Sequence, residues 1–102
     1  MDTEINNTNF EWDEYKNISN QEMHGVSFEL AQCTFYDINR IIVEDAAHSI
    51  DEERFYCFGK IGDDVITVRF TYRKNKIRIF GAGLWREGRR VYEQENKKNT
   101  IH

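Results

Sequence analysis

The pattern of apolar and polar residues between positions 54 and 83 is typical of a β-sheet with hairpin turns. It runs through three segments, RFYCFGKI, VITVRFTY and KIRIFGA, separated by the turn-rich stretches Gly62-Asp63-Asp64 and Lys74-Asn75. A two-residue turn at Lys74-Asn75 pairs Arg73 with Lys76 and Phe70 with Ile79. Because side chains alternate between the faces of a strand, this register predicts one apolar face and one basic face.

The register assigns the hairpin residues to these two faces. The apolar face consists of Ile66, Val68, Phe70, Tyr72, Ile77 and Ile79. The polar face consists of Thr67, Arg69, Thr71, Arg73, Lys76, Arg78 and Phe80. We expect helices to pack on the apolar face.

Two helices are predicted before this sheet. Asp13 suits the N-cap of the first helix, and Gly25 suits its left-handed stop. Ser27 can cap a second helix that runs from Phe28 to about Phe35.

Shorter signals complete an α+β fold. Residues 10–12 read as a short strand or lead-in, residues 41–43 as a strand, and residues 85–95 as a closing helix. We therefore predict two N-terminal helices packed on a mostly antiparallel sheet of about four strands, with a closing C-terminal helix. A polar N-terminal extension at 1–9, a single domain at 10–95 and a frayed tail at 96–102 are expected.

Composition narrows the class of protein. The chain has 102 residues, of which 39% are hydrophobic and 31% charged, as in a single soluble domain. No apolar run is long enough to cross a bilayer and the polar N-terminus is unlike a signal peptide, so we expect a cytoplasmic protein without membrane contact. Cys33 and Cys57 read as reduced, small buried residues. No disulfide framework, metal site or cofactor is predicted.

Charge is distributed unevenly along the chain. The net charge is −4, yet residues 69–92 hold eight Lys/Arg against one acid, Glu87, a local net charge of +7. Aromatic residues are interleaved with these cations. Basic groups for phosphates together with aromatic faces for bases are the elements of a nucleic-acid site, and we therefore expect an anionic partner.

Several ordered motifs give a more specific indication. They are Phe10-Glu11-Trp12-Asp13-x-x-Lys16, His24-Gly25-Val26-Ser27-Phe28-Glu29, Asp45-x-x-His48-Ser49, Glu53-Arg54-Phe55 and Thr71-x-Arg73 followed by Ile77-Arg78-Ile79. Over roughly residues 10–93 the chain resembles the BrnT-type toxins of bacterial type II toxin–antitoxin systems. The resemblance implies a RelE-like fold and growth arrest by RNA cleavage. It also implies neutralisation by a cognate antitoxin, usually a ribbon-helix-helix DNA-binding protein, without which no direct DNA binding is expected.

The chain departs from the family pattern at a few positions. Met23 stands where members commonly carry Lys, and Leu30 replaces the second glutamate of Ser-Phe-Glu-Glu. Gly81-Ala82-Gly83 stands where Ser-Ala-Arg is common, so one expected phosphate-binding arginine is missing.

Metal-independent RNA cleavage needs a base, a cation and an acid that converge on one phosphate. The candidates for catalysis are Lys16, His24, Arg78 and Glu87. The candidates for RNA binding are Arg69, Arg73, Lys76, Trp85, Arg86, Arg89, Arg90 and Tyr92.

Each candidate also has a structural interpretation. His24 could be a cation at a helix C-terminus, Lys16 a surface lysine, and the arginines a solvated face. Glu87 could pair with Arg90 or Lys76, and Tyr92 could pack in the core. Trp85 could be partly buried core, and His48 and Arg54 read as parts of a connection.

Two functions follow from these residues. The first is a growth-inhibiting, metal-independent ribonuclease toxin. The alternative is a catalytically weakened RNA- or protein-binding module, whose main role is complex formation with an antitoxin-like partner.

Overall fold

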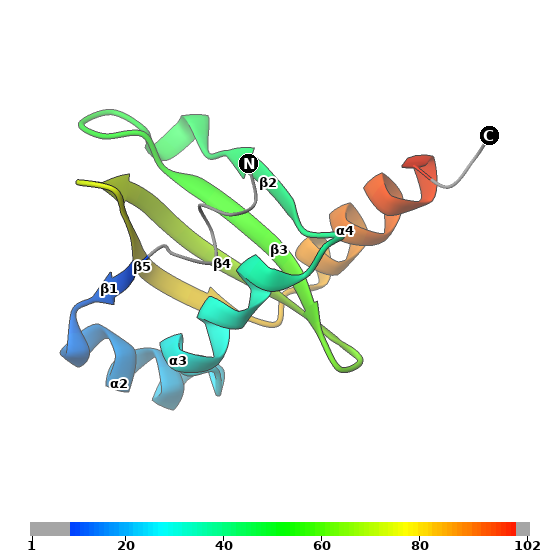
Figure 1. Cartoon of the computed structure of the whole chain (residues 1–102). Coiled ribbons are helices and arrows are strands. Elements are labelled where there is room, and N and C mark those ends of the chain that lie inside the picture. The colour runs from blue at the N-terminus through cyan, green and yellow to red at the C-terminus, as the bar shows by residue number, and fades with distance from the viewer. Residues whose placement is uncertain (1–8, 100–102) are drawn as a thin grey trace.

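The computed structural model describes residues 9–99 (Figure 1), so residues 1–8 of the predicted extension at 1–9 and residues 100–102 of the predicted tail at 96–102 lie outside the described part. Its elements are β1 (Asn9–Trp12), α2 (Glu14–His24), α3 (Phe28–Ala31), η1 (Gln32–Tyr36), β2 (Ile41–Glu44), η2 (Ala46–His48), β3 (Phe55–Ile61), β4 (Asp64–Arg73), β5 (Lys76–Gly83) and α4 (Arg86–Asn99). The predicted α+β class is confirmed. The second N-terminal helix is an α-helical turn that tightens into the 3-10 helix η1.

The sheet has five strands rather than about four. Their order is β1-β5-β4-β3-β2, with β1 parallel to β5 and the other pairs antiparallel. The additional strand is β1, which includes Asn9 of the expected extension. A short lead-in can add to a sheet as an edge strand because pairing satisfies its backbone groups.

The predicted hairpin register is confirmed. Arg73 pairs with Lys76 and Phe70 with Ile79, and both turn residues have positive φ, as a two-residue turn of type I′ requires. Further along, Arg69 pairs with Gly81, which leaves Phe80 as the extra residue of a β-bulge.

The apolar face of the sheet carries the main core beneath α2, α3 and η1 (Figure 1). Its buried residues are Val26, Phe28, Ala31, Phe35, Cys57, Ile66, Val68, Phe70, Ile77, Ile79 and Ala82. Tyr72, predicted on this face, lies at the rim with 56% of its surface exposed, although its ring contacts Phe55 and Phe70. Of the two cysteines expected to be buried, Cys57 is buried and Cys33 is exposed.

Two asparagines of α2 fix the position of that helix. Buried Asn17 accepts a hydrogen bond from the Phe28 backbone N–H (2.9 Å) and donates one to Glu29 (3.0 Å). Asn20 donates to the Ala82 carbonyl (2.8 Å) and accepts from the Ala82 N–H (3.2 Å). The C-terminal end of α2 is thereby held beside the end of β5.

Helix α4 packs on the opposite face of the sheet, where Phe58, Val65 and Tyr92 form a second, smaller core. The helix continues to Asn99, beyond the predicted end at residue 95. Gly88 lies directly on Thr67, where a Cβ atom would come within 1.9 Å of the Thr67 hydroxyl. Within residues 9–99, no helix combines the length and apolar character needed to span a membrane.

Candidate active site

A pocket of about 460 Å³ opens on the polar face of the sheet, between the start of α4 and the η2 turn. It is lined by His48, Tyr56, Phe58, Thr67, Arg69, Trp85, Glu87 and Gly88. Strands β3 and β4 provide its floor because Tyr56 is paired with Arg69 and Phe58 with Thr67. The pocket therefore brings three of the predicted site residues, Arg69, Trp85 and Glu87, together with His48.

Arg69 is the exposed cation of this pocket. None of the ion pairs within residues 9–99 includes it. One guanidinium nitrogen lies 3.8 Å from the position that a Cβ atom would take on Gly81, which is ordinary van der Waals contact, so the arginine extends beside this residue. An unpaired guanidinium is free to bind two oxygens of a phosphate.

Most other arginines of the basic segment are neutralised by acids, of which only Glu87 belongs to the segment itself. Arg73 pairs with Glu52 (3.3 Å), Arg78 with Glu11 (3.4 Å), Arg89 with Glu93 (2.9 Å) and Arg90 with Glu87 (2.5 Å). Arg86 is exposed and borders a neighbouring hollow beside Trp85. Lys76 is exposed in the β4–β5 hairpin.

His48 is held by a buried carboxylate. Its Nδ1 lies 2.9 Å from Oδ2 of Asp45, which is 8% exposed. A carboxylate at Nδ1 favours the tautomer with the proton on Nδ1, and it leaves Nε2 as an acceptor. Sequence reasoning placed His48 in a connection, and the motif Asp45-x-x-His48 was the signal that could have identified the pair.

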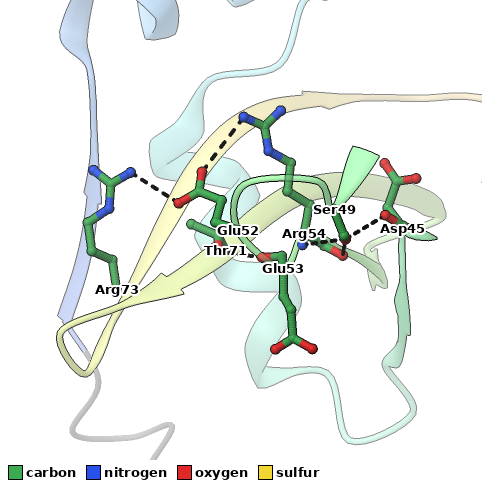
Figure 2. Close-up of polar contacts among 7 residues, drawn as sticks. All are labelled: Asp45, Ser49, Glu52, Glu53, Arg54, Thr71 and Arg73. Atoms are coloured by element: carbon green, nitrogen blue, oxygen red, sulfur yellow. Dashed lines mark hydrogen bonds and ion pairs between the residues drawn. The ribbon is translucent and has the colours of Figure 1, made fainter. Parts of the chain in front are cut away.

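The connection that carries His48 is anchored firmly to the sheet (Figure 2). The Ser49 hydroxyl donates to the Asp45 carbonyl (2.7 Å) and accepts from the Arg54 N–H (2.9 Å). Thr71 of β4 donates to the Glu53 carbonyl at 2.5 Å. Connection geometry, as predicted for this segment, is thus present, and it also positions the imidazole at the pocket.

Glu52 ties the same connection to the hairpin (Figure 2). Its carboxylate lies between Arg73 (3.3 Å) and Arg54 (3.7 Å). Arg73 therefore has a structural partner in addition to its predicted RNA contact.

Lys16 and Arg54 meet over the bulged Phe80. The Lys16 ammonium lies 5.6 Å and the Arg54 guanidinium 4.6 Å from the centre of the Phe80 ring. Phe80 precedes Gly81, which is opposite Arg69 in the sheet. Lys16 adds a cation on this side of Arg69, whereas Arg54 is also paired with Glu52. Sequence reasoning placed Arg54 in the connection, because its partner ring is distant in the chain.

His24 lies against Trp85, with 5.1 Å between ring centroids and 66° between ring planes. The indole also lies over Gly83, where a Cβ atom would come within 2.7 Å of the ring. An arginine at position 83 would therefore require Trp85 to move. The Trp85 ring thus occupies the space that a side chain at position 83 would need, which explains why glycine stands there instead of the arginine expected from the resemblance.

Glu87 and Tyr92 differ in their surroundings. A hydrogen bond from Arg90 holds the pKa of exposed Glu87 below its usual value, which makes the carboxylate a weak base. Tyr92 is buried and donates its hydroxyl to Asp37 (2.6 Å), and burial followed by this carboxylate raises the pKa of Tyr92. The structure supports the core-packing interpretation of Tyr92 rather than RNA contact.

Fold and site together define a small α+β protein with a largely aromatic pocket that contains Arg69 and a carboxylate-bound histidine. Residues 12–88 match the family model of BrnT, the ribonuclease toxin of type II toxin–antitoxin systems, and the chain belongs to this family. No curated protein gives a significant match to the sequence. In the described part of the chain, no three His, Cys, Asp or Glu side chains are grouped to hold a metal ion.

Proposed function

We propose that this member of the ribonuclease toxin family cleaves RNA without a metal ion, in the pocket that contains Arg69 and His48. The observation that carries the proposal is that one pocket contains both an unneutralised guanidinium, that of Arg69, and a carboxylate-bound imidazole, that of His48. The first group can bind a phosphate and the second can move a proton, which are two of the three roles that the reaction requires.

In this mechanism Nε2 of His48 accepts the proton of the RNA 2′-hydroxyl. The 2′-oxygen then attacks the adjacent phosphorus, and the bond from phosphorus to the 5′-oxygen breaks. Arg69 stabilises the additional negative charge on the phosphate oxygens. The leaving 5′-oxygen takes a proton from water in the open pocket, and the products carry a 2′,3′-cyclic phosphate and a 5′-hydroxyl.

The other predicted residues take supporting roles in this proposal. Lys16 and Arg86 bind flanking phosphates in this proposal because both side chains are exposed. Lys16 lies over the ring of Phe80 in β5, and Arg86 borders the hollow beside Trp85. Arg78, with its partner Glu11, contributes less than Arg69, since a neutralised guanidinium attracts an anion weakly.

Cleavage would occur in the cytoplasm and arrest growth until a cognate antitoxin neutralises the protein. Family membership supports this biology, together with the RelE-like architecture that we infer for the fold. We propose a ribbon-helix-helix antitoxin as the partner. An acidic segment of such a partner would fit the Arg69 surface.

A second candidate function is a weakened binding module that acts mainly through its antitoxin-like partner. The internal pairing of Arg73, Arg78, Arg89 and Arg90 favours it, because these arginines are already neutralised.

One assay separates the two functions. Purified wild-type protein, without antitoxin and with excess EDTA, is expected to cleave single-stranded RNA and leave 2′,3′-cyclic phosphate ends. Arg69→Ala should lower the cleavage rate at least about 100-fold, since loss of one group that stabilises the transition state has effects of this size. Lys60→Ala, which removes an exposed charge on β3, serves as the control. Intact RNA with the wild type would leave the binding module as the function.

A further inference from the structure

The pocket beside Arg69 has aromatic walls that the proposed proton transfer does not use. Tyr56 and Phe58 stack on neighbouring floor positions, with 5.9 Å between ring centroids and 15° between ring planes. Trp85 approaches from the segment before α4 and keeps 38% of its surface exposed. A flat aromatic ligand could therefore contact more than one ring.

Trp85 has a fixed orientation. Gly83 lies under the indole, where atoms of the six-membered ring lie 2.7–2.9 Å from an ideal Cβ position. The His24 ring contacts the indole at 5.1 Å between centroids. A ring held in this way loses little conformational entropy when a ligand stacks on it. The glycine at position 83 thus creates the space for a rigid aromatic surface next to the arginine.

The pocket also contains one cation that favours an anionic ligand. Arg69 can bind a negative charge close to the aromatic part of the ligand. The Thr67 hydroxyl is buried under Gly88 of α4, so it leaves the choice of ligand to the other lining groups. The volume of about 460 Å³ is that of a small-molecule site. A nucleotide, with a flat base and a phosphate on one scaffold, meets these requirements.

We propose that this pocket is a nucleobase subsite, in which one base of single-stranded RNA stacks on Trp85 while Arg69 binds the adjacent phosphate. The inference rests on the proposed function and adds a specificity-determining residue to it. Base stacking on an aromatic side chain tolerates different bases, so Trp85 would set the position of the RNA more strongly than its sequence.

The subsite is tested by binding rather than by cleavage. The probes are short oligonucleotides in which 2′-deoxy sugars prevent cleavage and one base at a time is absent. With the wild-type protein, removal of one particular base should weaken binding roughly tenfold, as expected for one lost stacking contact. With Trp85→Leu, removal of that same base should have no effect.

Two further proteins control the experiment. Trp85→Phe keeps an aromatic ring and should retain most of the dependence on that base. Leu84→Ala changes a neighbouring residue that is 53% exposed, and it should behave like the wild type. The proposal is overturned if the wild type does not bind the probes. It is also overturned if loss of the base weakens binding by the same factor in the wild type and in Trp85→Leu.

The outcomes also separate this inference from the proposed ribonuclease activity. The wild type could cleave ordinary RNA while the Trp85→Leu substitution leaves the effect of the missing base unchanged. This result would overturn the subsite alone. If the protein cleaves no RNA, but the effect of the missing base on binding depends on Trp85, the cleavage proposal is overturned and the subsite is supported.

Discussion

The two faces of the sheet are covered to different extents. Under α2, α3 and η1 the apolar face is closed, and its buried core residues are at most 3% exposed. On the other face α4 covers one end only, and the pocket with Arg69 remains open beside it. Alternate residues of the same strands thus pack in the core on one side and line the open pocket on the other. Substitutions on the first face should change stability, and those on the second should change activity.

The largest effect is expected from Gly59→Ala on the closed face. A Cβ atom there would lie 2.6 Å from the backbone oxygen of Thr34, and backbone of η1 cannot move aside as a flexible side chain can. We expect the free energy of unfolding to fall by about 3 kcal/mol, the upper range for overpacking. Urea denaturation followed by circular dichroism measures this change.

Gly81→Ala is the matched control on the open face. Its Cβ would lie 3.7–3.9 Å from its nearest neighbours, which is ordinary contact. Stability should change by less than about 1 kcal/mol. Equal losses from the two substitutions would contradict the difference between the faces.

The second effect concerns activity alone. His48→Gln on the open face removes the proposed proton acceptor, and the RNA cleavage rate should fall about 100-fold. The side chain of His48 is 60% exposed, so the unfolding midpoint should stay close to that of the wild type. His24→Gln provides the comparison, because that ring contacts Trp85 and is outside the pocket lining. A larger loss with His24→Gln would return the catalytic role to the residue chosen from sequence.

The sequence was sufficient to predict the register and the two faces. Both depend on local rules: a two-residue turn with positive φ at Lys74 and Asn75, and the period of two along a strand. The end of α2 at Gly25 could be predicted for the same reason, since that glycine adopts φ 72°. The parallel strand β1 was harder to predict from the sequence, because its pairing with β5 joins opposite ends of the chain.

The candidate site could be predicted only in part. A count of cations identifies the basic segment, but it cannot show that Glu11 neutralises Arg78 or that Glu52 neutralises Arg73. These acids lie 67 and 21 positions away, so only the fold reveals which arginine remains unpaired. The contact of Trp85 with Gly83 is local in sequence, and the absent side chain was the available signal.

The smallest effect tests the link between the two faces. Asp37 follows η1 on the closed face, and it accepts hydrogen bonds from the Tyr92 hydroxyl (2.6 Å) of α4 and the Lys60 N–H (2.7 Å) of β3. Burial raises the pKa of Asp37, but the hydrogen bonds from Tyr92, Lys60 and Asn39 and the charge of Arg40 outweigh burial, so the pKa is lowered.

A carboxylate with a lowered pKa in the folded protein stabilises the fold above its unfolded pKa, and this contribution is lost as the pH falls through the folded value. Asp37→Asn should therefore lower the free energy of unfolding by about 1–2 kcal/mol at pH 7. The difference from the wild type should begin to shrink below about pH 4, the ordinary pKa of an aspartate, and should be lost as the pH falls through the lower pKa of the folded protein. Denaturation at a series of pH values measures it, with Asp63→Asn in the exposed β3–β4 turn as the control. A difference that stays constant down to pH 2 would show that Asp37 acts through its shape and not through its charge, and that the two faces are joined at this point by packing alone.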